Sequence, residues 1–506
     1  MTSNLLEDQR TVWVVAAFSF LLFLIGNLPW QIDDYDQAKQ AYTSFEMIKE
    51  GRWFYQQTPR ERVATKPPLL GWVSAGLFAI TRSWEVAWRL PSLLAAIALT
   101  VLLFRTATSA YGTIAGLVAL SAFGLNLLTP RLATLVRTDM PLAFVIFLIG
   151  LLVWQKIERR EEWKAPDRVY LFALLTIAML IKGPIAYAFL LPGIVLLQWR
   201  TGRARPELVL SEVEGRAPLS TWSSWWPWIA SLAIFLLWVT GGILFQPGFF
   251  DEVVIREFLG RFGETIHRPQ PLYFYLPHLV HKFGPWSILL IGIAIFDLAS
   301  RRWKIGAAFR EMSPQTFWLL CWSLGGLFVM SLIPSKRVDR IFPVIPPFCL
   351  LLAAQVSGGL DALRQPDDPR RTGVAALRPH LAIGLLFAIF FTGSYTAWKV
   401  VTGYRDHRDA LAIFGRDVRR EAEAHHWRYE VVSAKDEGLL LYLQKTHYIE
   451  QGGAAGEWNA GNLDALIAST EKAEDLMPQL RGATVSQRKS SERKKEQGMD
   501  YVLITR

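Results

Sequence analysis

The chain contains little cysteine and little charge for its length. Two cysteines occur in 506 residues, Cys321 and Cys349, and both fall inside apolar runs, so a disulfide framework is excluded. Charged residues make up 19% of the chain, whereas 52% of the residues are hydrophobic and 13% are aromatic. This composition is too apolar for an ordinary soluble enzyme of several domains, and it predicts a membrane protein.

Long apolar stretches provide the predicted membrane spans. A spanning helix needs roughly 20 mostly apolar residues, because lipid cannot satisfy an exposed backbone group. Several stretches are short and have proline or glycine at their ends, so we expect about 11–13 transmembrane helices. The segment 69–81 is too short to count as a span, and we expect it at the interface or packed against the bundle. Eleven spans are predicted near 12–29, 86–105, 111–129, 141–155, 169–182, 184–199, 225–246, 285–298, 316–333, 341–356 and 381–400.

The positive residues concentrate in short loops between these stretches. The net charge is +10, which in a soluble chain would suggest a nucleic acid partner. Here the Lys/Arg-rich loops 155–168, 200–218, 300–310 and 363–379 fall on one side of an eleven-span topology, so the charge is explained by orientation and no nucleic acid is predicted. The positive-inside rule then predicts a multi-pass protein of the plasma (inner) membrane with a cytoplasmic N-terminus.

The predicted domain organisation has two parts. Residues 1–400 form a transmembrane domain, in which 31–84 is the first outer loop and contains interfacial helices. Residues 401–506 are more polar and contain short alternating runs such as "RYEVVSA" and "MDYVLITR". They predict a small soluble α/β domain on the outer (periplasmic or extracellular) side.

The first outer loop contains two candidate stretches. For Asp33 and Asp34, a solvated loop is the simpler interpretation. Asp36 opens a run with apolar residues at helical spacing, which predicts an interfacial amphipathic helix, and a carboxylate there is also suited to a helix cap. Lys66 precedes two prolines in "ATKPPLLGW". This lysine either snorkels to the interface or meets a lipid phosphate.

Two further stretches place ionisable residues beside the outer surface. In "RLATLVRTDMPLAF", Arg137 and Asp139 come directly before a span; they are candidates for function, and a pair that merely orders the turn is the competing interpretation. The other stretches are 258–278, with Glu257 before it, and the turn 334–343. They combine basic and aromatic residues, which suits either interfacial anchoring or an anionic lipid donor. The residues are Glu257, Arg261, His267, Lys336, Arg337 and Arg340.

The order of these motifs resembles a known superfamily. The pattern "D-D-x-D…GRW…KPPLLGW…WRLPS" (33–92), followed by "RTDMPLAF", "IKGPIAYAF", "REFLGRF…HRPQPLYFYLP" and "SKRVDRIFPVIPP", resembles the GT-C glycosyltransferases of the protein mannosyltransferase and lipid A aminoarabinose transferase type. The resemblance covers most of residues 10–360. It implies a GT-C fold and an integral membrane glycosyltransferase that takes a sugar from a polyprenyl-phosphate donor.

The resemblance also implies roles for individual residues. Asp36 matches the catalytic carboxylate of the first outer loop and Asp139 a second functional acid. Lys66 matches a lysine that meets the donor phosphate, and Arg261 and Lys336 match further phosphate-binding positions. Supporting roles are expected for Asp34, Arg137, Glu257, His267, Arg337 and Arg340.

Two departures from the family pattern concern a metal. Thr65 stands where the lipid A transferases have glutamate, and Phe258 stands where they have histidine. Those family positions help hold zinc, so the resemblance implies no metal site here, and the sequence leaves a role for a divalent cation open. A lipid A acceptor is correspondingly disfavoured.

The predicted reaction is an inverting sugar transfer on the outer side of the membrane. A glycan, lipid or protein acceptor attacks the anomeric carbon, Asp36 takes the acceptor proton, and Asp139 orients the acceptor or replaces Asp36. Membrane lipids are the expected surroundings. The alternative is a polytopic lipid or sugar transporter (flippase), which predicts charge near the bilayer midplane and an internal repeat, and the sequence contains neither. A structural membrane protein would leave the ordered acid and lysine motifs unexplained.

Overall fold

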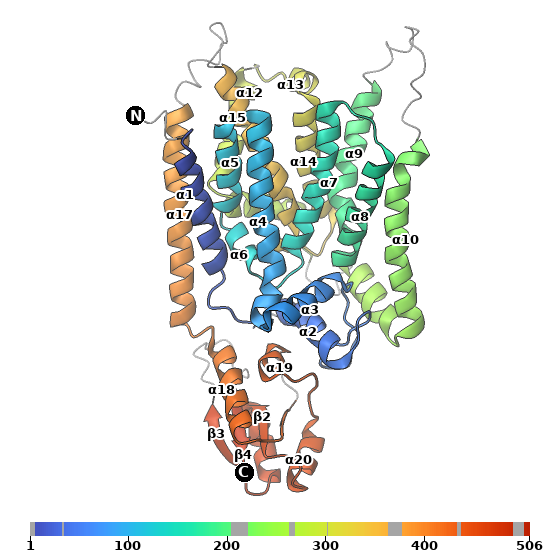
Figure 1. Cartoon of the computed structure of the whole chain (residues 1–506), viewed down its shortest axis with the longest axis vertical. Coiled ribbons are helices and arrows are strands. Elements are labelled where there is room, and N and C mark those ends of the chain that lie inside the picture. Colours follow the sequence, from blue (N-terminus) through green and yellow to red (C-terminus); the bar gives the residue numbers. More distant parts are fainter. Residues whose placement is uncertain are drawn as a thin grey trace.

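The computed structural model describes residues 6–32, 35–203, 221–262, 269–300, 302–362, 377–432, 437–488 and 500–506. A bundle of long helices forms most of the molecule, and a small domain with a β-sheet lies at one end of it (Figure 1). Residues 31–32 and 35–84 of the predicted first outer loop (the outer loop) lie between the two (Figure 1). The predicted fold class, a polytopic helical protein with a small C-terminal α/β domain, is confirmed.

Most bundle helices coincide with the predicted apolar stretches, whereas α11 (Tyr275–Lys282) and α13 (Ile305–Glu311) lie outside them. Each of the eleven predicted spans overlaps a helix. The helices are α1 (Gln9–Ile25), α4 (Trp84–Tyr111), α5 (Thr113–Gly124), α6 (Thr129–Ala133), α7 (Asp139–Arg159), α8 (Ala165–Lys182), α9 (Ile185–Arg203), α10 (Thr221–Phe245), α11 (Tyr275–Lys282), α12 (Trp286–Ser300), α13 (Ile305–Glu311), α14 (Pro314–Leu332), α15 (Ile345–Ala362) and α17 (Leu377–Arg405).

Not all of these helices are long enough to cross a membrane alone. Among the described residues, six are long and apolar enough, or seven if a pair bent by 107°, Leu272–Lys282 with Trp286–Ala299, counts as one span. Others are shorter; α5, for example, has 12 residues, whereas a full crossing takes roughly 20. The apolar stretches therefore located the helices, and these helices differ in length from one predicted span to the next.

The bundle is packed inside and apolar outside. Glycines bring α9 and α14 together, since a Cβ added at Gly193 would lie 3.1 Å from the Trp322 backbone. On the outer surface of the bundle, Leu237, Ile288 and Phe390 are each about two-thirds exposed or more, at 71%, 68% and 73%. Large apolar side chains facing outward in this way are suited to lipid and not to water.

The first outer loop contains two helices that lie across the end of the bundle (Figure 1). The predicted amphipathic helix is confirmed as α2 (Tyr35–Glu50), with Asp36 in its first turn. An isolated bridge between Gln57 and Val63 follows, and then α3 (Leu69–Thr81) packs against α2 and α4. Later in the chain, shorter helical segments line the same end of the bundle: the π-helix η2 (Phe250–Phe258), and the 3₁₀ segments η3 (Leu259–Arg261), η4 (Leu272–Phe274) and η5 (Val338–Val344).

The C-terminal domain is built on a four-stranded sheet with strand order β1-β2-β4-β3. Strand β1 pairs with β2 in parallel (Tyr429 opposite Ala465), and β4 is antiparallel to both β2 and β3. The runs "RYEVVSA" and "MDYVLITR" contain β1 and β4. The predicted boundary at residue 401 falls in the last turns of α17. The elements are α18 (Ala410–Ala424), β1 (Tyr429–Val431), α19 (Glu437–Leu443), α20 (Gln451–Asn459), β2 (Ala465–Ser469), α21 (Thr470–Leu476), η6 (Met477–Gln479), β3 (Thr484–Arg488) and β4 (Tyr501–Thr505).

The two domains share a hydrophobic core. Buried residues of the outer loop, including Ile32, Tyr42 and Phe45, pack in one cluster with Leu411 and Leu440 of the C-terminal domain. The Tyr442 hydroxyl also accepts a hydrogen bond from the Ile32 N–H at 2.7 Å. The C-terminal domain is therefore fixed on the outer loop, beside the charged residues of that loop.

Candidate functional site

A cavity of about 520 Å³ lies where the outer loop, the ends of the bundle helices and the C-terminal domain meet. Its walls are strongly charged: the described lining residues include ten basic and six acidic side chains. The basic ones are Lys39, Arg60, Arg62, Lys66, Arg137, Lys182, Arg256, Arg261, Arg337 and Arg340, and the acidic ones are Asp36, Asp139, Glu252, Glu257, Asp339 and Glu437. An excess of cations inside a partly enclosed cavity favours an anionic ligand.

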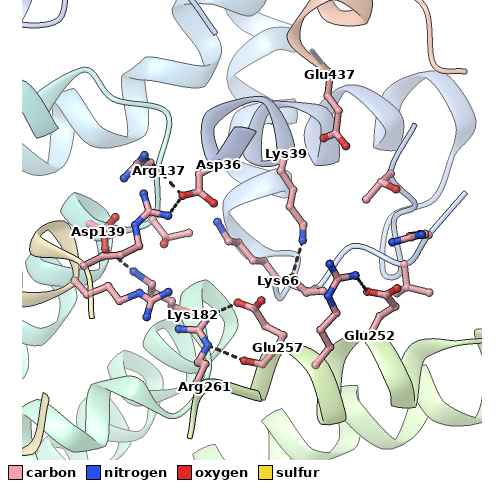
Figure 2. A pocket seen from close by; sticks show the side chains of 18 of the residues that line it. Asp36, Lys39, Lys66, Arg137, Asp139, Lys182, Glu252, Glu257, Arg261 and Glu437 are labelled. Atoms are coloured by element: carbon pink, nitrogen blue, oxygen red, sulfur yellow. Dashed lines mark hydrogen bonds and ion pairs between the residues drawn. The ribbon is translucent and has the colours of Figure 1, made fainter. Parts of the chain in front are cut away.

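Asp36 contacts two of these arginines. Its carboxylate is ion-paired with Arg337 and lies 3.7 Å from an Arg137 nitrogen (Figure 2). Burial alone would raise the pKa of Asp36, but the charges of Lys66, Arg337 and Arg137 outweigh it and lower the pKa to about 2. Asp36 is therefore a carboxylate at any ordinary pH.

Two further ion pairs connect distant helices at the cavity wall. Arg137, in the turn before α7, pairs with Asp339 of η5. Asp139, the first residue of α7, pairs with Lys182 at the end of α8 (Figure 2). Arg137 and Asp139 thus each have an ion-pair partner from another element, so these residues do more than order their own turn. The pairs hold α7, α8 and η5 together around the cavity.

Lys66 follows the outer hairpin, the turn closed by the bridge between Gln57 and Val63. Charged side chains lie near the Lys66 ammonium group. Burial lowers its pKa to about 8, with the nearby charges of Lys182 and Lys39 acting in the same direction and Asp36 acting against them. Lys39 donates a hydrogen bond to the Thr65 hydroxyl at 3.0 Å, which fixes the backbone beside Lys66. The prolines after Lys66 lead directly into α3.

Glu257 and Arg261 close the cavity from the side of η2 and η3. Arg261 donates to the Glu257 backbone carbonyl at 2.7 Å and forms an ion pair with its carboxylate. Burial would raise the pKa of Glu257, but Arg261 and the more distant Lys39 and Lys66 lower it. Arg340 of η5 also lines the cavity and donates to the Ser335 carbonyl at 2.8 Å.

Among the described residues, one predicted site residue, Lys336, is not part of the cavity wall. Lys336 is 6% exposed, and its ammonium group donates a hydrogen bond to the Gln270 carbonyl at 2.9 Å. Asp34 and His267 lie outside the described residues. The other predicted residues, Asp36, Lys66, Arg137, Asp139, Glu257, Arg261, Arg337 and Arg340, all line the cavity.

Several lining residues were missed in the sequence. Lys182 was visible as a lysine between two apolar runs, and Asp339 stands inside the quoted "SKRVDR" motif, so a signal existed for both. Lys39 lies one helical turn after Asp36, which is also readable once α2 is predicted. Glu437 had no local signal, because it comes from the C-terminal domain and reaches the cavity only through domain docking.

Among the residues that the structure describes, no group of three or more His, Cys, Asp or Glu side chains is placed to hold a metal ion. Thr65, at a position where the lipid A transferases have glutamate, lines the cavity and binds Lys39 instead.

The chain is similar to known glycosyltransferases. Residues 65–213 match the family model described as dolichyl-phosphate-mannose-protein mannosyltransferase. An undecaprenyl phosphate-α-4-amino-4-deoxy-L-arabinose arabinosyl transferase of Pectobacterium atrosepticum is 24% identical over 373 residues, which cover 72% of this chain and 62% of that protein. The chain thus spans less than two-thirds of the length of that relative.

Solved structures share the fold over nearly the whole chain. The crystal structure of ArnT from Cupriavidus metallidurans bound to undecaprenyl phosphate matches with a TM-score of 0.68 and 17% identity, over 97% of each chain. An oligosaccharyltransferase from Archaeoglobus fulgidus, in complex with zinc and sulfate, matches with a TM-score of 0.50 and 13% identity over 93% of this chain and 70% of that one. The resemblance first seen in the motif order is confirmed.

Proposed function

We propose that this chain, which has the fold of the GT-C superfamily of membrane glycosyltransferases and matches their sequences, transfers a sugar from a polyprenyl-phosphate donor to an acceptor. The observation that carries the proposal is the Asp36 carboxylate, which shares one cavity with a cluster of arginines and lysines at the end of a membrane bundle. A carboxylate suits a general base, and the cations suit a phosphate leaving group.

A lipid-linked donor suits the position of the cavity. The cavity lies at the end of helices with apolar outer surfaces, so the tail of a polyprenyl donor can remain in the bilayer while its phosphate reaches Lys66, Arg261 and Arg340. A compact ammonium and planar guanidinium groups are the usual phosphate ligands in proteins. The solved ArnT structure contains undecaprenyl phosphate, which supports a donor of this chemical class.

The reaction forms one bond and breaks one bond at the anomeric carbon. The acceptor oxygen attacks this carbon on the face opposite the phosphate, its proton passes to the Asp36 carboxylate, and the bonding electrons of the old glycosidic bond leave with the polyprenyl phosphate. The cations compensate the charge that develops on the phosphate oxygen. Asp139, held by Lys182, shapes the same cavity and is proposed to orient the acceptor.

Donor binding should also make Asp36 a better base. With a pKa of about 2, Asp36 is a weak proton acceptor, because Lys66 and Arg337 stabilise its charge. A phosphate that binds to Lys66 would partly neutralise the charge of this lysine. The pKa of Asp36 then rises, so the base gains strength when the donor is in place.

The proposed orientation places the cavity outside the cell. Asp139 begins α7 at the cavity, so Arg159 and the basic loop that follows lie at the other end of that helix. Lys/Arg-rich loops favour the cytoplasmic side. The cavity and the C-terminal domain then face the periplasm or cell exterior.

Transfer of radiolabelled sugar tests the proposal. Membranes containing the wild type or Asp36→Asn receive a panel of undecaprenyl-phosphate-linked sugars, and Asp251→Asn, an exposed aspartate on η2 outside the cavity lining, is the matched control. We expect transfer to fall by about 10²–10⁴-fold in Asp36→Asn, with undecaprenyl phosphate still bound and the control unchanged. Equal transfer by the wild type and Asp36→Asn would remove Asp36 from the chemical step, and no transfer from any donor by the wild type would refute the proposed activity.

A further inference from the structure

Glu437 is the contribution of the C-terminal domain to the cavity. It is the one lining residue, among those described, that comes from beyond residue 405. The side chain is 7% exposed, and its Oε2 atom is fully buried without a hydrogen-bond partner in the described parts of the chain. A buried carboxylate oxygen without a partner is costly, so a native protein rarely keeps one unless a ligand or a bound water completes it.

Backbone contacts hold Glu437 in this place. The next residue, Gly438, lies so close to the outer loop that a Cβ added there would be 1.9 Å from the Ile32 carbonyl oxygen. One turn further along α19, Tyr442 accepts a hydrogen bond from the Ile32 N–H. Glu437 is therefore positioned by the domain interface, before any ligand binds.

Glu437 lies near Lys39 of α2, the helix that also contains Asp36. Lys39 is the nearby charge that most lowers the pKa of Glu437, although burial has the larger effect and raises that pKa overall. Lys39 lies three residues after Asp36 on α2, about 4.5 Å further along the helix axis. In Figure 2, Glu437 lies on one side of Lys39, and Lys182 and Arg261 lie on the other.

This arrangement separates the two ends of the cavity. If the donor phosphate binds at Arg261 and Arg340, the sugar lies near Asp36, and an inverting reaction requires the acceptor to approach from the opposite side. Glu437 lies across Lys39 from Arg261, which is the side left for the acceptor (Figure 2).

We propose that Glu437 binds the acceptor and that it accepts a hydrogen bond from an acceptor hydroxyl or amine beside the attacking oxygen. The inference rests on the proposed function. A carboxylate without a partner accepts hydrogen bonds from hydroxyl or ammonium groups and repels a phosphate. The acceptor group bound here is therefore neutral or cationic, as in a glycan or an amino sugar.

Steady-state kinetics test this role. The wild type, Glu437→Gln and Glu437→Ala are compared with Glu430→Gln, a matched control whose carboxylate pairs with Lys445 inside the C-terminal domain at 2.9 Å. We expect Glu437→Gln to raise the acceptor KM by about 10–100-fold and to leave the donor KM within about twofold. Thermal unfolding of each variant shows whether the fold is retained.

Some outcomes would contradict the inference and another would contradict the proposed function, and the experiment tells the two cases apart. A rise in the donor KM alone would place Glu437 at the transferred sugar, and no change in either KM would leave it without a role in binding; both overturn the inference. If the wild type transfers no sugar, the proposed function fails. Saturation-transfer NMR then measures the binding of methyl glycosides, glucosamine and glucose 6-phosphate instead. The inference then expects the glycosides or glucosamine to bind the wild type better than Glu437→Gln, and equal binding would overturn it.

Discussion

Lys66 and Asp36 show how single residues set the electrostatics of the cavity. Each lies among charges that change the pKa of the other: Asp36 keeps its negative charge because of Lys66, and Lys66 keeps part of its positive charge because of Asp36. With a pKa of about 8, Lys66 is charged at neutral pH and loses its proton in a mildly alkaline range.

Phosphate binding should therefore weaken at alkaline pH. The pKa of Lys66 is lowered from 10.5 to about 8, so its attraction for a phosphate is present below pH 8 and is lost as the pH rises through that value. We expect Lys66→Met to bind undecaprenyl phosphate about 10–100-fold more weakly at pH 7 and to lack most of the decline in affinity between pH 7.5 and 9.5. Titration calorimetry in nanodiscs measures both effects.

Lys336→Met is the matched control for Lys66. The Lys336 ammonium group is held by the Gln270 carbonyl and lies outside the cavity lining, so this variant should keep the affinity and the pH dependence of the wild type. A wild-type pH profile in Lys66→Met would contradict the assignment of the titration to Lys66.

At the scale of elements, α2 supports the cavity in two ways: some of its residues line the cavity wall, and a buried residue holds the neighbouring hairpin in place. Glu46 is fully buried on α2, accepts a hydrogen bond from Arg52 at 2.8 Å and another from the Gln57 N–H at 2.6 Å. These bonds fasten the outer hairpin, which continues into Thr65 and Lys66. Burial nevertheless raises the pKa of Glu46 to about 7, because it outweighs the Gln57 and Arg52 hydrogen bonds.

The stability of this element should depend on pH. The pKa of Glu46 is 4.5 in an unfolded chain and about 7 in the folded one, so the folded state binds the extra proton between these values and stability falls as the pH rises from about 4.5 to 7. Glu46→Gln imitates the protonated form. We expect its melting temperature to change less than that of the wild type between pH 5 and 8, as measured by scanning fluorimetry in detergent, and parallel curves for the two proteins would contradict the expectation.

For the whole molecule, the contact between the domains decides whether the site is complete. The C-terminal domain is docked through a shared hydrophobic core and through the close approach of Gly438 to Ile32. Because a backbone carbonyl cannot move as a flexible side chain can, any larger residue at position 438 must shift the domain.

Gly438→Ala should therefore separate the domains without unfolding the bundle. We expect faster proteolysis in the segment 406–409, just after α17, and loss of acceptor binding, while undecaprenyl phosphate still binds. Gly456→Ala in α20 is the matched control: a Cβ there meets nothing within 4 Å, and the change should be neutral or stabilising by about 0.4–1 kcal/mol. Wild-type proteolysis of Gly438→Ala would show that the contact does not hold the domains together.

Much of this protein follows from the sequence alone. Apolar stretches located the helices of the bundle, the spacing of Ala38, Ala41 and Phe45 predicted α2, and two alternating runs predicted β1 and β4. These features are local, since periodicity and length act within one segment. The order of short motifs also indicated the GT-C fold and eight of the residues that line the cavity.

The tertiary structure decided which charges meet. Only the folded chain pairs Asp139 with Lys182 and Arg137 with Asp339, removes Lys336 from the cavity and brings Glu437 into it. It also sets the length of each helix, such as the 12 residues of α5. These outcomes depend on packing between segments far apart in the chain, and a pattern within one segment carries no information about such contacts.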